Sequence, residues 1–564
     1  MSSTASASSF LERALDPYGM MTPVLHAQLA WLAHPRELAD LGAQFAGLAL
    51  ELQRHAWLRA AGLPSADPVE PHPDDQRFAD PVWREHVAWD LLKEGYLAFT
   101  HHVQDALYRT PGLSEKQRRQ AAFWWRKWLN AAAPTNFLWT NPVALRKAVE
   151  TGGASLAAGW RNFLADFEAG TVRLTDPRDF HVGKDLATAP GAVVFRNRLL
   201  EVIHYRATRD RVHRIPVAIA TPWINKFYIL DLAEGRSLVR FLLDRGFDVY
   251  IASWKNPTPE MRDVTFDAYI EDGIAKLVET ASRVSGSGEV HAVGYCLGGT
   301  ALAMYLAWAN ARAAPLHAPV PHWTLFTTLV DFASPGDIEV FLDESTVAHL
   351  AEAMARKGYL DGKEMAAAFR LLRSNSLIWQ YVVRGWLYGE APRPLDVLFW
   401  NMDTTRMPAA MHTWYLRELY LANRLVEPDA LAIAGTPIDL GRIAQPLYAV
   451  GCQDDHIAPW KQTFRIANFA AGPKRYVRSS AGHVLGIVNP PVTPAKRSFR
   501  AGEARITDTV ESWLARTTET PGSWWEDWVA WLAPLCGEMV PARPVATASH
   551  PALAAAPGAY VLET

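Results

Sequence analysis

The sequence predicts an α/β protein in which a helical N-terminal domain precedes a domain built on a parallel β-sheet. From Pro23 to Leu174, apolar residues recur every three or four positions, which is typical of amphipathic helices. After Asp176, short apolar runs rich in β-branched and aromatic residues alternate with helical stretches, as in a parallel sheet covered on both faces. The predicted strands are 215–223, 247–254, 289–296, 323–332, 445–452 and 474–480.

These patterns divide the chain at about residue 175. We predict a helical domain over residues 1–175 and a catalytic domain over 176–564. The segment 66–81 is rich in proline and acid, so it is predicted to be a loop between helices. Residues from about 334 to 444 interrupt the alternation of strands and helices. This stretch is too long for a simple crossover and has helical patterns of its own, so we predict a lid inserted over the sheet.

Composition excludes several classes of protein. The formal net charge of −3, without a long run of Lys or Arg, provides no basic field for nucleic acid. Three cysteines without a C-x-x-C spacing indicate neither a disulfide framework nor a zinc site, and they favour a reducing cytosol. No run of eighteen apolar residues and no signal-peptide pattern occur, so we expect neither a membrane span nor export. We also expect no cofactor and no metal. The 23 tryptophans are expected mainly in packing, with contact to an apolar surface as the alternative.

The stretch Gly-Tyr-Cys-Leu-Gly-Gly, residues 294–299, carries the strongest chemical signal. It follows a predicted strand and precedes a predicted helix at 300–312. This is the setting of the nucleophile elbow G-x-S-x-G of the α/β-hydrolase fold, with Cys296 in place of serine. A helix N-terminus favours thiolate over thiol. The alternative is an inert cysteine buried in a glycine-rich turn.

A nucleophile in this fold requires an acid and then a histidine later in the chain. Asp455 follows the predicted strand 445–452, although the adjacent Asp454 is an alternative, and His483 follows the last predicted strand. We therefore predict a triad of Cys296, Asp455 and His483. The predicted oxyanion donors are the backbone N–H of Leu297 and one from the loop after strand 215–223, either Ile224 or Trp223.

Sulfur in the elbow favours acyl transfer over hydrolysis. An acyl group on Cys296 is a thioester, about as activated as an acyl-CoA, so it can be loaded from CoA and then passed downhill to a hydroxyl. His483 would take the thiol proton and later activate the alcohol, while Asp455 would orient the imidazole. A lid would exclude competing water.

Beyond the elbow, several blocks resemble the polyhydroxyalkanoate synthases, which polymerise 3-hydroxyacyl-CoA into storage polyester. GYCLGG resembles the cysteine box of that family, and the similarity extends from about Ala79 to the end of the chain. The other blocks are TNFLWTNP (135–142), INKFYILDL (224–232), SLVRFLLDRGFDVYIASWKNP (237–257), FWNMDTTRMP (399–408), DDHIAPW (454–460) and GHVLGIVNPP (482–491). Asp231 and Trp400 also match family positions, without an assigned role.

The resemblance implies Cys296 as nucleophile, Asp455 as acid and His483 as base. The ending PGSWWEDWVAWLAP followed by APGAYV resembles class I, which implies chiefly (R)-3-hydroxybutyryl-CoA as substrate; class II, with medium-chain substrates, is the alternative. It also implies a homodimer at the surface of cytoplasmic polyester granules, in contact with the growing polyester chain. Residues 1–175 would then serve dimerisation or granule association.

Two positions depart from the family. Trp223 replaces a small residue, where a large side chain would either narrow the entrance to the site or alter the oxyanion loop, and Asp454 replaces a glutamate. The remaining alternatives are a cysteine-dependent thioesterase or polyester depolymerase on the same fold, and a granule-coating protein with a vestigial triad.

Overall fold

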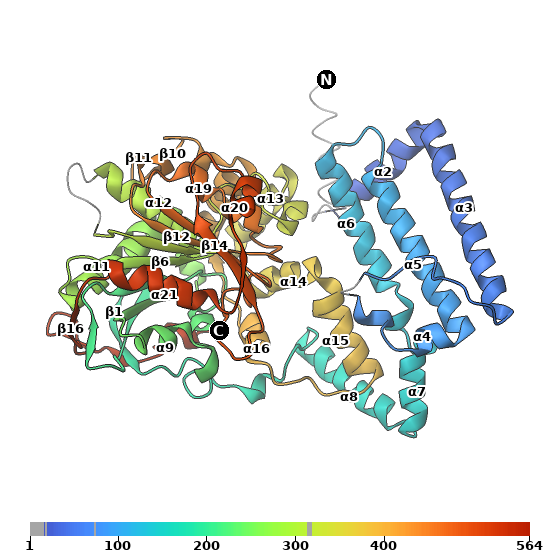
Figure 1. Cartoon of the computed structure of the whole chain (residues 1–564), viewed down its shortest axis with the longest axis horizontal. Helices are drawn as coiled ribbons and strands as arrows, with labels where there is room; N and C mark the ends of the chain where they lie inside the picture. Colours follow the sequence, from blue (N-terminus) through green and yellow to red (C-terminus); the bar gives the residue numbers. More distant parts are fainter. Residues whose placement is uncertain (1–15, 17–19, 73–74, 313–318) are drawn as a thin grey trace. The chain divides into compact units, whose positions relative to one another are not determined.

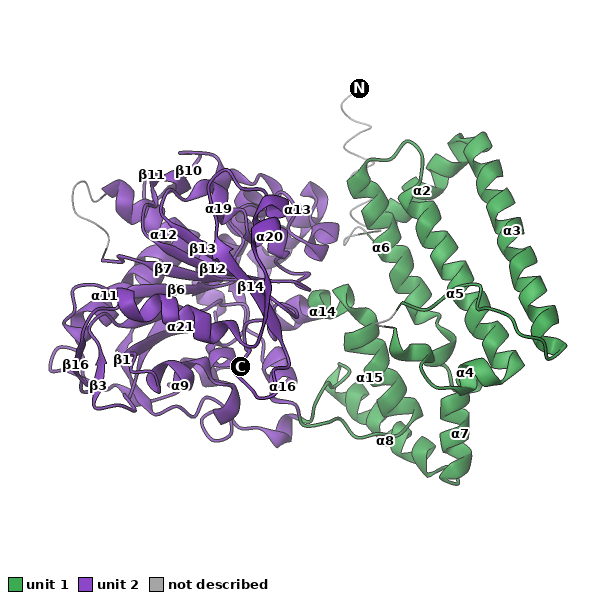
Figure 2. Cartoon of the chain, in the orientation of Figure 1, with its two compact units in different colours: residues 1–176, 367–394 green, residues 177–366, 395–564 purple. Residues whose placement is uncertain are grey.

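The chain consists of two compact units, which Figure 2 distinguishes by colour. The computed structural model describes residues 16, 20–72, 75–312 and 319–564 (Figure 1). Unit 1 contains residues 1–176 and 367–394, and unit 2 contains 177–366 and 395–564. The first fifteen residues, on which the expectation about a signal peptide depends, lie outside the described part.

Unit 1 is built from helices. Its principal helices are α2 (Thr22–Ala33), α3 (Pro35–Ala60), α4 (Val82–Glu85), α5 (Val87–Tyr108), α6 (Glu115–Ala131), α7 (Pro142–Glu150) and α8 (Ala154–Ala169). Local sequence explains where several of them begin and end. Ser114 and Gln117 form a capping box at the start of α6. The Asn141 side chain caps α7, and Gly170 ends α8 in the left-handed conformation.

The structure differs from the predicted domain division in the insertion. Residues 367–394 belong to unit 1 rather than to the catalytic domain. They contain part of α14 (Gly362–Leu372) and α15 (Gln380–Val382), and they are held by side chains of the N-terminal helices. Lys127 Nζ donates to Leu372 O at 2.9 Å, and Trp386 Nε1 donates to Asp166 Oδ2 at 2.8 Å. The helical pattern shows that the segment has an apolar face, but not which partner covers it.

Unit 2 is organised around an eleven-stranded sheet with the order β15-β14-β13-β12-β7-β6-β4-β5-β2-β1-β17. The six predicted strands form its consecutive parallel centre, so the parallel sheet is confirmed. They are β4 (Val217–Ala220), β5 (Val249–Trp254), β6 (His291–Tyr295), β7 (Trp323–Phe326), β12 (Leu447–Cys452) and β13 (Lys474–Ser479). The sequence analysis missed the antiparallel strands at both edges. These are β1 (Gly191–Arg196), β2 (Leu200–Tyr205), β14 (Ser498–Glu503), β15 (Glu519–Pro521) and β17 (Ala554–Ala555).

Helices cover both faces of this sheet (Figure 1). Alternate side chains of β4 enter two separate cores: Ala218 and Ala220 pack on one face, and Val217 and Ile219 on the other. The first face is covered by α11 (Ala275–Ser285) and α12 (Leu297–Arg312), and the second by α9 (Leu238–Leu243) and α21 (Trp524–Leu535). Trp524, Trp525 and Trp528 of α21 are buried, so part of the tryptophan content serves packing.

The part of the insertion that remains in unit 2 contains further helices and one short pair of strands that are distant in the sequence. The helices include α13 (Glu344–Lys357), α16 (Asp396–Met402) and α17 (Ala409–Trp414), which continues as a π-helix over Tyr415–Leu421. Strand β8 (Tyr359–Leu360) pairs antiparallel with β9 (Met407–Pro408). Across the residues that the structure describes, none of the helices is both long and apolar enough to span a membrane.

Candidate active site

Cys296 lies on a strained turn between β6 and α12. Its φ angle is +51°, in the left-handed region that residues with a side chain rarely adopt. The turn is fixed by hydrogen bonds from Cys296 N–H to Phe326 O at 2.8 Å and from Gly299 N–H to Cys296 O at 2.9 Å. The side chain is partly exposed. The elbow geometry therefore presents the sulfur at the carboxyl edge of the parallel strands, where this fold places its nucleophile.

Three glycines around Cys296 are required by close approach. A Cβ on Gly294 would meet Gly299 Cα, and a Cβ on Gly299 would meet the Thr328 side chain. On Gly298 it would meet the backbone carbonyl of Ala220 and lie 2.6 Å from Thr221 O. The start of α12 thus packs directly on the end of β4 and on the loop that follows it.

Replacement of Gly298 by alanine is expected to destabilise unit 2 by roughly 1–3 kcal/mol, since a backbone carbonyl cannot move aside as a flexible side chain can. Urea unfolding followed by tryptophan fluorescence would measure the change. Gly235→Ala is the matched control, because no atom lies within 4 Å of the added Cβ. Equal stability of the two variants would contradict the expected clash.

The predicted acid and base lie together after two neighbouring strands. His483 Nδ1 is 2.7 Å from Asp455 Oδ2, and both residues are buried. The other carboxylate oxygen, Oδ1, accepts hydrogen bonds from the backbone N–H groups of Ile457 and Ala458, each at 2.8 Å. Asp454 is exposed to solvent instead. Of the two candidate aspartates, the structure brings Asp455 to the imidazole.

The charges around His483 favour its protonated form. Burial acts to lower the pKa of His483, but the Asp455 carboxylate and the Cys296 sulfur raise it, with a net pKa well above the ordinary value. A hydrogen bond to Cys296 contributes to this rise, so the structure brings all three predicted residues into one chain of contacts. Such an imidazole can accept the thiol proton and leave a thiolate beside it.

The loop after β4 carries the predicted second oxyanion donor. The N–H groups of Leu297 and Ile224 donate no hydrogen bond to other atoms in the described part of the chain, so both remain available to a ligand. The indole of Trp223 points into the core, where its ring centroid lies 4.4 Å from that of Tyr269 and 5.1 Å from that of Trp254. The expectation that a tryptophan here would narrow the entrance is therefore wrong, because Trp223 is only 2% accessible among aromatic rings. The alternative, that it alters the oxyanion loop, stays a prediction.

Tyr415 and Tyr420 are two residues near Cys296 that were not predicted from the sequence. Burial raises the pKa of Tyr420 to about 12, and the nearby Cys296 sulfur contributes to the rise. Burial likewise raises the pKa of Tyr415, again with a contribution from Cys296. The two phenol oxygens are 3.4 Å apart. Both tyrosines come from the insertion, and in the sequence they appear only as part of a helical pattern.

Asp231, which matches a family position, holds a loop rather than facing Cys296. Its carboxylate accepts hydrogen bonds from Ser237 Oγ at 2.7 Å and from Ala189 N–H at 3.0 Å. Burial raises its pKa. These contacts account for the aspartate without a chemical role.

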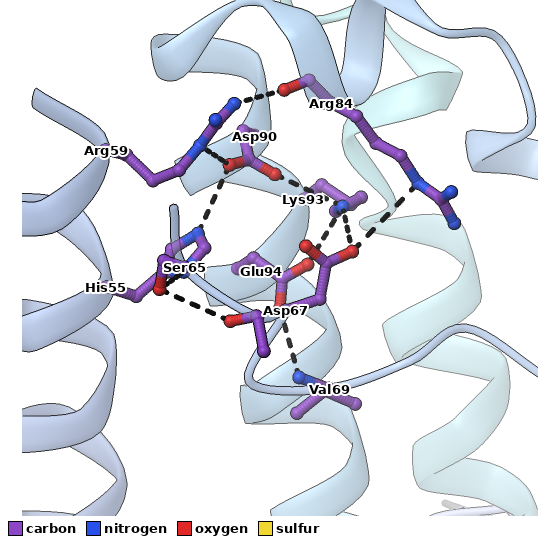
Figure 3. Close-up of polar contacts among 10 residues, drawn as sticks. His55, Arg59, Ser65, Asp67, Val69, Arg84, Asp90, Lys93 and Glu94 are labelled. Atoms are coloured by element: carbon purple, nitrogen blue, oxygen red, sulfur yellow. Dashed lines mark hydrogen bonds and ion pairs between the residues drawn. The ribbon is translucent and has the colours of Figure 1, made fainter. Parts of the chain in front are cut away.

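A separate cluster of acidic residues lies in unit 1 (Figure 3). Oxygen atoms of Asp67, Asp90 and Glu94 converge closely enough to bind a metal ion. However, Lys93 Nζ lies among them, at 3.0, 3.2 and 2.9 Å respectively. The ammonium group already supplies the positive charge that a cation would bring, so the cluster joins α5 to the loop after α3 as an ion-pair network.

Comparison with known proteins matches both parts of the chain. The family model described as "Poly-beta-hydroxybutyrate polymerase (PhaC) N-terminus" matches residues 74–242, and the model of the alpha/beta hydrolase fold matches 229–490, which confirms the predicted fold class. The chain is 40% identical to the poly(3-hydroxyalkanoate) polymerase of Methylorubrum extorquens, over 94% of this chain and 88% of the relative. It is 39% identical to the poly(3-hydroxyalkanoate) polymerase subunit PhaC of Cupriavidus necator, over 86% and 83%. Among solved structures, a hydrolase from Pseudomonas aeruginosa PA01 covers 51% of this chain and 89% of its own, at 16% identity and a TM-score of 0.30.

Proposed function

The chain belongs to the family of poly(3-hydroxyalkanoate) polymerases, and we propose that it polymerises (R)-3-hydroxyacyl groups from CoA thioesters into polyester, with release of CoA. The observation that carries this proposal is the contact chain of Cys296, His483 and Asp455 on an elbow that holds sulfur instead of oxygen. A thioester enzyme intermediate suits a reaction that begins from one thioester and ends in an oxyester.

Each half of the proposed reaction uses the same three side chains. His483 accepts the thiol proton, and the Cys296 sulfur attacks the carbonyl carbon of the acyl-CoA. The tetrahedral intermediate collapses, the C–S bond to CoA breaks, and the imidazolium returns the proton to the departing CoA thiolate. In the second half His483 takes the proton of a 3-hydroxyl group, whose oxygen attacks the acyl thioester. The new ester leaves with the lengthened chain, and the proton returns to Cys296.

In both steps, Asp455 would stabilise the imidazolium and the backbone N–H groups would stabilise the oxyanion. The 2.7 Å contact to Nδ1 keeps the imidazole in the tautomer whose Nε2 can accept a proton. Leu297 N–H and Ile224 N–H would stabilise the oxyanion of each tetrahedral intermediate. Leu297 begins α12, and Gly298 of that helix packs against Ala220 and Thr221, from which the loop to Ile224 continues; this proximity supports the assignment of both donors to one site.

For substrate and location, the proposal follows the resemblance to class I synthases. It names (R)-3-hydroxybutyryl-CoA as the main substrate, a homodimer as the active form and the granule surface in the cytoplasm as the location. Exposed aromatic residues on unit 1 support contact with an apolar polymer. The most exposed are Trp57, Trp139, Trp160 and Phe167, with 70%, 78%, 60% and 74% of each residue accessible. Part of residues 1–78, for which a targeting role is open, lies outside the described residues.

The direct test is incubation of the purified protein with (R)-3-hydroxybutyryl-CoA, in which released CoA and the acyl product are both measured. We expect CoA release in excess of enzyme together with insoluble polyester. Free 3-hydroxybutyrate would instead establish a thioesterase, because water would then have attacked the acyl-enzyme. Parallel assays with (R)-3-hydroxyoctanoyl-CoA would separate a short-chain from a medium-chain enzyme.

A further inference from the structure

The last residues of the described chain are tied to the loop that carries Ile224. Lys226, two residues after Ile224, donates from Nζ to Val561 O at 2.7 Å and to Glu563 O at 2.5 Å. The same ammonium group forms an ion pair with Asp403 at 3.1 Å, and its side chain is only 4% accessible. A buried lysine with these partners fixes the backbone on either side of it.

The Glu563 side chain holds a second loop next to the first. One carboxylate oxygen is 2.6 Å from Lys255 Nζ, and the other accepts from Asn256 N–H at 3.0 Å. Asn256 Oδ1 in turn accepts from Arg406 N–H at 2.9 Å. Through Asn256, Glu563 therefore reaches the segment 403–406 of the insertion.

The segment 403–406 contacts the loop that carries Ile224 and so completes a ring of contacts. Thr405 Oγ1 donates to Trp223 O at 2.5 Å, and Thr405 N–H donates to Ile224 O at 3.4 Å. Trp400, which matches a family position, donates from Nε1 to Lys226 O at 2.7 Å. The loop 223–226 is thus held through its backbone carbonyls by the insertion and through the Lys226 side chain by residues 561–563.

The segment 559–563 has its own anchor on the sheet. The Glu201 carboxylate, fully buried on β2, accepts from the N–H groups of Ala559 and Tyr560, each at 3.0 Å. Tyr560 Oη donates to Asn197 O at 2.7 Å, and Val561 is buried. The segment therefore links strand β2, next to the parallel centre of the sheet, to the loop that carries Ile224.

We propose that Glu563 and Lys226 are positioning residues for the oxyanion site, which hold Ile224 N–H in place through segment 559–563. The physical reason is that an oxyanion donor lowers the barrier only when it is fixed before the charge develops. Neither side chain contacts the reacting atoms in this arrangement. The inference rests on the proposed function, in that it assigns Ile224 to the oxyanion site of the Cys296 reaction.

The test compares Glu563→Ala, Glu563→Gln and Lys226→Met with the full-length wild type. We expect kcat for CoA release to fall about 10- to 100-fold in Glu563→Ala and Lys226→Met, with KM changed by less than about threefold. Glu563→Gln, which keeps an acceptor for Asn256 N–H, should retain more activity than the alanine variant. The matched control is Glu538→Gln, because the Glu538 side chain is 72% exposed and lies away from this ring.

Two further measurements distinguish positioning from a loss of folded enzyme. Rates are expressed per Cys296 thiol titrated with iodoacetamide in folded protein isolated by size-exclusion chromatography, because unfolded chains would also expose Cys452 and Cys536 to the reagent. Acylation is also followed as the burst of p-nitrophenol from p-nitrophenyl butyrate, which reports on the oxyanion site whether or not polymer forms. Wild-type burst rates per thiol in Glu563→Ala and Lys226→Met would overturn the inference, whereas hydrolysis by the wild type would overturn only the proposed function.

Discussion

Replacement of Cys296 by alanine is expected to lower CoA release at least about 10³-fold, because no other nucleophile lies at the elbow to form the acyl-enzyme. Alanine tolerates the left-handed backbone conformation at position 296 at least as well as cysteine does, so the variant should keep the fold. CoA release followed with a thiol reagent, in protein of matched thermal stability, measures the effect.

Two variants sharpen this test. Cys536→Ala removes a buried thiol at the end of α21 and should leave the rate within about threefold of the wild type. Cys296→Ser keeps a nucleophile but replaces the thioester by an oxyester, so it should lose polymer formation more than it loses slow hydrolysis of activated esters. Wild-type CoA release by Cys296→Ala would assign the chemistry to another residue.

The centre of the sheet could be predicted because its strands are buried on both faces, which leaves continuous apolar runs in the sequence. The antiparallel strand β2, which lies between β5 and β1, was missed although all six of its residues are buried. Its Glu201 and His204 interrupt the apolar pattern, and their partners come from distant segments: Glu201 binds the N–H groups of residues 559 and 560, and His204 Nε2 is 2.6 Å from Asp248. A local sequence pattern cannot show that the charges of Glu201 and His204 are neutralised, because their partners lie far along the chain.

In the candidate site, too, some residues could be predicted from local motifs and others could not. The order of nucleophile, acid and base follows from the topology of the fold, so Cys296, Asp455 and His483 could be selected from motifs alone. The tyrosines near Cys296 could not, because Tyr415 and Tyr420 come from an insertion whose path is not fixed by strand order. Nor could the contacts of Lys226 with residues 561 and 563, which join positions more than 330 residues apart.

The division of the insertion between the two units could not be predicted from the sequence either. Helical periodicity predicted helices between residues 334 and 444, and the structure contains them. It could not predict that residues 367–394 join unit 1 while residues 395–444 remain in unit 2. The proposed lid is therefore confined to the parts of the insertion that unit 2 retains, including the segment 403–406 that contacts the loop 223–226.

Replacement of Asp455 by asparagine is expected to lower kcat by about 10³- to 10⁴-fold. The amide oxygen can still accept from Ile457 and Ala458 N–H, so the loop should keep its conformation. The amide NH₂ would then face His483 Nδ1 and force that nitrogen to act as an acceptor. The imidazole proton would move to Nε2, which could no longer take the proton of the Cys296 thiol.

Asp454→Asn is the matched control for this variant, since it makes the same change one residue earlier on an exposed side chain. The backbone bond from Asp454 N–H to Ala481 O at 3.0 Å is unaffected by the substitution. We expect its kcat to stay within about threefold of the wild type. Comparison of the two variants under saturating substrate, with unfolding measured in parallel, separates the tautomer effect from a change in local charge. Equal losses in both would mean that the net negative charge of the loop, rather than the 2.7 Å contact to Nδ1, supports the reaction.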